Sequence, residues 1–330
     1  NVISKPMIHG MVGSRVGIIY DGIQIENQQW GQDHNPNIDQ NAFEEIRLIK
    51  GAGILKYSGD TPGGVVVLEN KLPKINDSLY GKSIISGVTN GRGLNIISSW
   101  TKSYNSGNYF KAQATLKRNG DFSAPKYMLS NSGNSENNIS LTLGKNKILS
   151  QWKMNFSYFS QEIGILRSSH IGNVSDLVYA IELAKPTIIE PFDHQIRSPK
   201  QVNNHYSTRI QYSKRDKSNG KLTAKYSWQR NKREEYDVRR AELNKKPALD
   251  LTLNTHDFLS NYQWEKSNWS LDSGVFFQIQ DNYSNPDTGA RRLIPDYLKT
   301  ELGTYFTASL NPSNDYSLSF GFRFGHQHNH

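Results

Sequence analysis

The stretch Leu222-Thr-Ala-Lys-Tyr-Ser-Trp-Gln229 decides the fold class of this chain. Apolar or aromatic side chains alternate in it with polar ones, residue by residue. Successive side chains of a β-strand point to opposite faces, so the stretch predicts a strand with one apolar wall and one polar wall. The same alternation returns in segments 110–117, 152–158, 269–280 and 316–324. Little helical pattern lies between these segments, which favours an antiparallel meander.

The connections between the expected strands alternate in length. Short turns are expected around 105–107, 145–147, 215–220, 266–268 and 311–315, and long loops around 119–136, 162–202, 232–249 and 283–297. Short turns at one end and long loops at the other are typical of a transmembrane antiparallel β-barrel of the outer-membrane type. A soluble sandwich with one buried face is the alternative, and the loop asymmetry counts against it. We expect about eleven strands, roughly half of the 22 of a plugged transporter barrel.

Composition limits the function classes. The chain has 330 residues, a net charge of +9, no Cys and 11% aromatic residues, and its mean hydropathy is −0.67. The lack of Cys excludes disulfide scaffolds, thiolate metal sites and Cys nucleophiles. No apolar run reaches the ~18–20 residues of a membrane-spanning helix, whereas alternating barrel strands keep the average hydropathy low. The positive charges are scattered rather than gathered in one stripe, so nucleic acid is not an expected partner.

Residues 1–76 follow a different pattern from residues 77–330. Segment 15–20 predicts a buried strand, Asp21-Gly22 a tight turn, and 23–26 the return strand. A helix-to-strand segment is expected at 43–49 and a further strand at 65–68. We therefore expect a small α+β domain at 1–76 and the first half of a barrel at 77–330. The chain starts at Asn1 without Met or a leader and ends directly after a strand-like run, which indicates a fragment or a mature piece.

The loop at 162–202 contains a short apolar repeat at helical spacing. Leu177, Ile181 and Ala184 recur three and four residues apart, which predicts a helix over 175–184. Ser175 is the expected N-cap, because a Ser side chain can accept a hydrogen bond from a free amide of the first turn.

The chain resembles a TonB-dependent outer-membrane receptor, of the kind seen in Bacteroidetes-type bacteria. The segments that carry the resemblance in the first region are Lys5-Pro-Met-Ile-His-Gly10, Arg15-Val16 with Tyr20-Asp21-Gly22, Gln28-Gln-Trp-Gly-Gln-Asp-His34 with Pro36 and Ile38-Asp39, Glu45-Ile46-Arg47 with Lys50-Gly51, and Gly63-Gly-Val-Val66. His9 departs from the family pattern, in which Arg is usual. In the second region, 164–173 and 292–297 look like loop segments of the same receptors.

The resemblance implies a plug that closes a 22-stranded barrel, with energised import driven by the TonB-ExbB-ExbD complex. It implies a monomer in the Gram-negative outer membrane, in contact with lipid and lipopolysaccharide, with long loops outside and short turns in the periplasm. The TonB box, the first part of the plug and about half of the barrel are expected to lie outside this chain. No resident cofactor is required. The expected cargo is a scarce nutrient, foremost a metal ion or metal chelate: zinc, copper, or an iron siderophore or haem.

Two His-containing segments are the candidate metal ligands. Asp33 and His34 lie in a plug loop, and imidazole beside carboxylate suits first-row metals. His326, His328 and His330 recur every second residue, so they either share one face of an extended strand or converge in a loop, and His-rich tracts often bind metal. By strand parity the tail should open an external loop, where it could meet Asp33 and His34 in a cage above the plug. A structural loop for Asp33-His34 and a solvated loop start for the tail are the alternatives.

The remaining candidates concern the ligand more generally. We take Gln28, Gln29 and Trp30 of the plug loop, and Arg167 and His170 of the 162–202 loop, as ligand-binding candidates. No catalytic residue is predicted. Gly51-Ala-Gly53 lacks the third Gly of a dinucleotide fingerprint, and no acid–base constellation is visible, so an enzyme is not expected. A surface adhesin or structural outer-membrane β protein is the alternative from another class, and a passive porin is the third. Neither has a use for a plug.

Overall fold

The structure is a computed structural model that describes residues 5–27, 34–169, 173–238, 245–311 and 316–330. Within these ranges, eleven strands form one curved antiparallel sheet in which each strand pairs with its neighbours along the chain. The strands are β5 (Ser78–Val88), β6 (Gly93–Ser103), β7 (Asn108–Asn119), β10 (Asn134–Asn146), β11 (Ser150–Gly164), β12 (Lys200–Arg215), β13 (Gly220–Tyr236), β14 (Leu249–Lys266), β15 (Trp269–Ser284), β16 (Tyr297–Leu310) and β17 (Leu318–Asn329). The meander and the strand number that the sequence predicted are confirmed.

The two faces of this sheet are the reverse of those of a soluble protein. On β13, Leu222 is exposed on the outer face, whereas Ser227 and Gln229 are buried on the inner face. On β17, the apolar residues Phe320, Phe322 and Phe324 are likewise exposed. The alternation therefore places apolar side chains outside and polar ones inside, as barrels that face lipid do.

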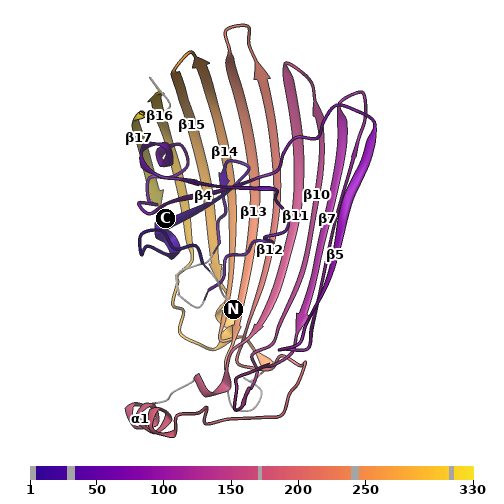
Figure 1. Ribbon diagram of the computed structural model, residues 1–330. Helices are drawn as coiled ribbons and strands as arrows, with labels where there is room; N and C mark the ends of the chain where they lie inside the picture. The colour runs from indigo at the N-terminus through magenta and orange to yellow at the C-terminus, as the bar shows by residue number, and fades with distance from the viewer. Residues whose placement is uncertain (1–4, 28–33, 170–172, 239–244, 312–315) are drawn as a thin grey trace.

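The connections gather by length at opposite ends of the sheet (Figure 1). At one end the long loops contain β8 (Phe122–Ser123), β9 (Met128–Leu129), the 3-10 helices η3 (Arg167–Ser169) and η5 (Pro286–Thr288), and helix α1 (Val174–Leu183). The expected helix is present, but its N-cap is Asn173 rather than Ser175, because the Asn173 side chain accepts the Asp176 amide. Among the described residues, no helix has both the length and the apolar character needed to span a membrane.

The N-terminal residues form a separate four-stranded sheet in the order β2-β1-β4-β3. Its elements are η1 (Gly13–Arg15), β1 (Val16–Tyr20), β2 (Ile23–Gln24), β3 (Glu45–Ile49), η2 (Gly51–Lys56) and β4 (Gly64–Glu69). Strands β1 and β4 are parallel and centre on Ile19, Val65 and Val67, which are fully buried. The return strand is shorter than expected, and 43–49 contains strand β3 without the expected helix, because a turn precedes it.

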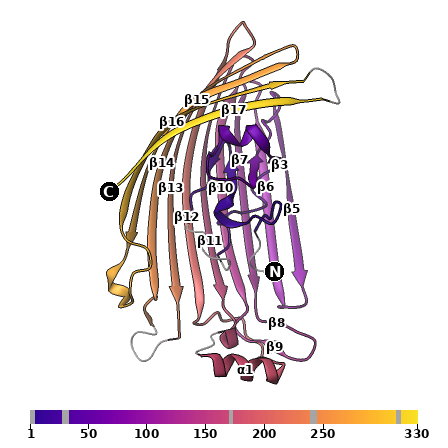
Figure 2. The ribbon, with the colours of Figure 1, turned by 90° about the vertical axis from the view of Figure 1, so that its left-hand side faces the viewer.

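This small sheet lies against the concave, polar face of the large sheet (Figure 2). Most contacts between the two are polar, with one apolar cluster in which Ile23 packs on Leu259 and Tyr305. We use the word plug for residues 5–69 and the term inner wall for the concave face. The seating of the plug on the inner wall creates the cavities described below.

Candidate functional site

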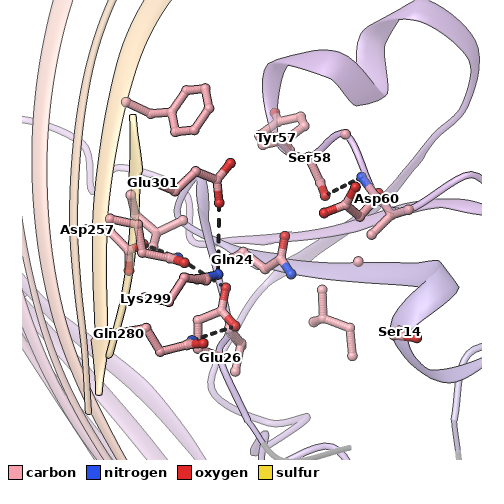
Figure 3. Close-up of a pocket in the computed structure, with 18 of the residues that line it drawn as sticks. Ser14, Gln24, Glu26, Tyr57, Ser58, Asp60, Asp257, Gln280, Lys299 and Glu301 are labelled. Atoms are coloured by element: carbon pink, nitrogen blue, oxygen red, sulfur yellow. Dashed lines mark hydrogen bonds and ion pairs between the residues drawn. The ribbon is translucent and has the colours of Figure 1, made fainter. Parts of the chain in front are cut away.

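A polar cavity of about 580 Å³ lies between the plug and the inner wall of β14–β17. In Figure 3, Glu26, Asp257, Gln280, Lys299 and Glu301 line one side, and Tyr57, Ser58 and Asp60 line the other. The barrel residues come from the parts of β14, β15 and β16 nearest the long loops. The cavity is therefore on the long-loop side of the plug, and we call it the upper cavity. Its size falls within the ~300–1,000 Å³ of small-molecule sites.

One amide links the two carboxylates at the base of the upper cavity. Gln278 Nε2 donates to Asp257 Oδ1 at 2.8 Å and to Glu26 Oε1 at 3.3 Å. Gln280 Nε2 donates to the other oxygen of Glu26 at 3.4 Å. The Glu26 carboxylate is thereby held by two glutamines of one barrel strand, and residue 26 is fixed two residues before the plug loop at 28–33.

Gln229 of β13 fixes the backbone of the same segment. Its Nε2 donates to the carbonyl of Gln24 at 2.9 Å, and its Oε1 accepts the amide of Glu26 at 3.1 Å. A side-chain amide that both donates to and accepts from an extended backbone mimics a neighbouring strand. The plug segment after β2 is thus satisfied by the barrel wall rather than by plug residues.

Burial raises the pKa of the Glu26 carboxyl above its ordinary value, because the charged form loses hydration in the cavity. The positive charge of Lys299 and the hydrogen bonds from Gln278 and Gln280 oppose this effect. Burial likewise raises the pKa of the Tyr57 hydroxyl on the facing side. The cavity thus favours the neutral form of Glu26 more than water does.

The side of the upper cavity nearest the sheet edge is lined by groups of both signs. Lys299 Nζ lies 3.9 Å from Glu301 Oε2, and Arg323 Nη2 lies 4.0 Å from Glu301 Oε1. Arg323 also donates to the carbonyl of Leu55 at 3.1 Å and stacks 3.8 Å from the ring centre of Phe276. A cavity with cations, carboxylates and amides suits a polar ligand, and the described lining holds no paired nucleophile and base.

The plug-loop candidates lie mostly outside the described residues: Gln28, Gln29, Trp30 and Asp33 all do. His34 is described and is buried, with Nε2 at 3.1 Å from Glu235 Oε1 on β13. Arg233 lies beside it, 3.4 Å from the same carboxylate oxygen. His34 therefore faces the inner wall and contacts a carboxylate from the barrel.

The loop candidates divide in the same way. Arg167 forms an ion pair with Glu190, with Nη1 and Oε1 2.8 Å apart, and so ties two parts of the 165–199 loop together. His170 lies outside the described residues. The structure thus gives Arg167 a carboxylate partner within its own loop.

The C-terminal histidines lie away from His34. β17 pairs with β16 as far as Asn329, so the period of two continues and His326, His328 and His330 share the outer face with Phe324. His34 faces the inner wall. The predicted cage of both groups is therefore not formed by these four histidines, and the described part of the chain contains no cluster of three or more His, Asp or Glu placed to hold a metal ion.

Sequence reasoning missed the residues that line the upper cavity. No sequence motif includes Glu26, Gln229 or Asp257. Gln278 and Gln280 were noted only as polar residues that alternate with apolar ones along their strand. That alternation correctly puts them on the inner face. The partner of each residue depends on where the plug sits, and Gln229 and Glu26 are 203 positions apart.

Comparison with known proteins identifies the smaller sheet. The family described as TonB-dependent Receptor Plug Domain matches residues 1–65, which include β1, β2, β3 and the first two residues of β4. Residues 1–65 thus carry the plug domain of TonB-dependent receptors. No curated protein sequence matches it. The family resemblance seen in the plug motifs is thereby confirmed, and the Bacteroidetes-type assignment stays a prediction.

Solved structures share the fold over nearly the whole of this chain. The ferric-catecholate import receptor Fiu of E. coli K12 has a TM-score of 0.68 at 12% identity, over 99% of this chain and 55% of its own. The FrpB iron transporter of Neisseria meningitidis has a TM-score of 0.69 at 14% identity, over 96% and 51%. The copper transporter OprC has a TM-score of 0.67 at 12% identity, over 97% and 48%. The receptor chain described here thus spans about half the length of these proteins.

Proposed function

We propose that this chain forms the plug and the first barrel strands of an outer-membrane receptor that imports a scarce nutrient with energy delivered through TonB-ExbB-ExbD. In this proposal residues 1–76 are the plug domain and 77–330 the barrel part; strand β4 ends at Glu69 and β5 begins at Ser78. The long loops face outward and the short turns face the periplasm. The apolar outer face, which carries Phe320 and Phe322, contacts lipid.

The observation that carries this proposal is the polar seating of the plug on the inner wall. Asp39 accepts from Gln113 of β7 at 2.8 Å, Asp21 pairs with Lys153 of β11 at 2.7 Å, and Glu26 binds Gln278 of β15. Each of these hydrogen bonds to a charged group contributes only about 1.5–3 kcal/mol net, because folding exchanges hydrogen bonds with water for those within the protein. A plug held in this way closes the lumen yet can be displaced by mechanical work, which a structural protein or an adhesin does not need.

The cargo we propose is a metal ion or metal chelate. The solved neighbours are named as receptors or transporters for ferric catecholate, iron and copper. In the chain itself, Asp33 and His34 remain the proposed metal contacts, and Gln28, Gln29, Trp30, Arg167 and His170 the proposed contacts with a chelate. The upper cavity, on the long-loop side of the plug, supplies carboxylate and amide groups on the inward path.

Uptake by cells that carry the full-length receptor tests the proposal. Radioactive zinc, copper and iron–catecholate are offered in turn to cells with and without the receptor gene. We expect receptor-dependent uptake of one of them, lost when the proton-motive force is dissipated. His34→Ala should reduce this uptake. His9→Ala is the matched control, because it removes another plug histidine, one whose partner is Lys50 of the plug rather than the inner wall. Equal uptake with and without the receptor for every cargo would contradict the proposal.

A further inference from the structure

A second cavity of about 370 Å³ lies on the other side of the turn at Asp21-Gly22, which we call the plug turn. We call this second cavity the lower cavity. Gly22, Lys56 and Tyr57 line both cavities and so separate them. The barrel side of the lower cavity comes from the short-turn ends of β11–β14, and further residues of the N-terminal region, among them Arg47 and Glu69, complete the plug side. These four strands lie in the interior of the sheet order, so the barrel wall is continuous here.

Cations dominate the lining of the lower cavity. The five basic side chains are Arg47, Lys56, Lys153, Lys221 and Lys225. The carboxylates of the lining are Asp21 and Glu69, and two more pair with its cations from outside it, Asp272 with Lys56 and Glu45 with Arg47. Five basic side chains therefore face four carboxylates, a formal excess of one positive charge in the space between plug and wall.

The existing contacts do not use up these cations. Lys153 pairs with the Asp21 carboxylate at 2.7 Å, whereas Lys225 donates only to the neutral Asp21 carbonyl, also at 2.7 Å. The side chain of Lys221 has no hydrogen bond or ion pair with any residue in the described ranges. The charges of Lys56 and Lys153 act on both Lys221 and Lys225. Like charges in a partly desolvated space repel one another, and an anion between them removes the repulsion.

Neutral donors complete the chemistry of the lower cavity. The side-chain amides of Gln151, Gln211 and Gln263 line it together with the hydroxyl of Thr223. Ammonium groups bind phosphate and carboxylate as point charges, and amides add hydrogen bonds to the oxygens. The volume lies within the range of small-molecule sites. The ligand class that fits is a small oxyanion with more than one negative charge.

We propose that the lower cavity is a binding site for a small multivalent oxyanion, bearing phosphate or carboxylate groups, with Lys221 as a direct contact. The site is on the short-turn side of the plug, separate from the upper cavity. It requires neither transport nor displacement of the plug. Because Lys153 and Lys225 also hold Asp21, a bound anion shares cations with the plug turn.

Calorimetric titration of the full-length receptor in detergent tests this site, with inorganic phosphate and citrate as separate probes. We expect saturable binding of at least one, and the comparison distinguishes a phosphate from a carboxylate ligand. Lys221→Gln should weaken binding about tenfold, as expected for loss of one hydrogen bond from a charged donor. Lys217→Gln makes the same charge change at an exposed position of the β12–β13 turn, outside the lining, and should leave binding unchanged.

The design separates this proposal from the proposed function. Titration needs neither metal nor TonB, so failure of uptake leaves the anion site standing, and failure of the titration leaves uptake standing. Lys221→Gln should keep the melting temperature of the receptor, because the side chain has no hydrogen bond or ion pair in the described structure. Absence of saturable binding of both anions overturns the proposal. Equal weakening by Lys217→Gln and Lys221→Gln also overturns it, because the effect would then be a general loss of charge.

Discussion

Lys56 of the plug and Asp272 of β15 form an ion pair in which Nζ and Oδ2 are 2.6 Å apart. Asp272 is already held from the barrel side, since Asn261 and Tyr305 donate to its Oδ1 at 3.0 and 2.9 Å. The side chains of Lys56 and Asp272 are only 20% and 10% exposed. The plug thus docks onto a carboxylate that the inner wall has already oriented.

The first prediction concerns this ion pair. Lys56→Met keeps the apolar stem but leaves Asp272 with neutral donors only. We expect a loss of about 1–3 kcal/mol in the free energy of unfolding, because a mostly buried charge loses its charged partner. Lys74→Met, at an exposed position after β4, is the control. Scanning calorimetry of the full-length receptor measures the difference, and identical melting of the two variants would show that the pair contributes nothing.

The second prediction concerns Gly22, whose φ is +82°. A Cβ at this position would lie 1.9 Å from Lys225 Nζ, so Gly22→Ala must move the ammonium that donates to the Asp21 carbonyl. Gly10 has a φ of +76° with nothing within 4 Å of its Cβ position, so Gly10→Ala measures the backbone strain alone. We expect Gly22→Ala to cost about 1–2 kcal/mol more than Gly10→Ala, the value of one hydrogen bond from a charged group.

A double-mutant cycle checks the origin of that difference. In a Lys225→Ala background the ammonium is gone, so Gly22→Ala and Gly10→Ala should cost about the same in the free energy of unfolding. Chemical denaturation of the three single and two double variants gives the comparison. An excess cost of Gly22→Ala that persists without Lys225 would place the clash elsewhere in the turn.

The sequence predicted which face of each strand a residue occupies, because the period of two is a local property. It predicted Asp21-Gly22 as a turn for the same reason. It did not predict that Lys225 donates to Asp21, since these residues are 204 positions apart and only the seating of the plug joins them. Pairing over such distances depends on the packing of two sheets, which no local pattern encodes.

The histidine tail shows a different reason for a missed feature. The sequence put His326, His328 and His330 in an external loop after the last strand. The alternation that begins at Leu318 and passes through Phe324 continues through these histidines, and β17 pairs with β16 as far as Asn329. The side-chain chemistry of His suggested a metal ligand, whereas the backbone pairing decided which face it occupies.

The third prediction concerns the turn between β12 and β13. The Tyr262 hydroxyl donates to Asp216 Oδ2 at 2.7 Å, and the amides of Gly220 and Ser218 donate to Oδ1. These hydrogen bonds, that from Tyr262 foremost, lower the pKa of Asp216. Because the pKa of Asp216 is lower in the folded state than in the unfolded state, its carboxylate stabilises the turn at pH values above the unfolded-state pKa. This stabilisation is lost as the pH falls through the folded-state pKa.

Hydrogen exchange of the Gly220 amide measures this effect. Asp216→Asn should speed exchange at neutral pH relative to the unaltered receptor, and the difference should vanish in acid, where Asp216 is protonated. Tyr262→Phe removes the leading cause of the lowered pKa of Asp216. As the pH falls, the Gly220 amide of this variant should therefore lose its protection from exchange at a higher pH than in the unaltered receptor. A difference between Asp216→Asn and the unaltered receptor that is the same at all pH values would mean that the carboxylate charge does not hold the turn.

The fourth prediction concerns Glu26 in the upper cavity. Burial raises its pKa above the ordinary 4.5, so the folded receptor binds a proton more readily than the unfolded chain. The stabilisation from this proton binding is complete below pH 4.5. It is lost as the pH rises through the pKa that Glu26 has in the folded state. Glu26→Gln carries no such charge, so its stability relative to the unaltered receptor should rise with pH across this window and then stay constant.

Melting temperatures of Glu26→Gln and the unaltered receptor, measured from about pH 4 to about pH 8, give this difference as a function of pH. Glu265→Gln removes the same charge at an exposed position near the end of β14, outside the upper cavity, and is the matched control. Lys299→Met should strengthen the pH dependence in the unaltered Glu26 background, because the Lys299 charge opposes the effect of burial. A relative stability of Glu26→Gln that falls with rising pH would mean that the hydrogen bonds from Gln278 and Gln280 outweigh the lost hydration of the carboxylate.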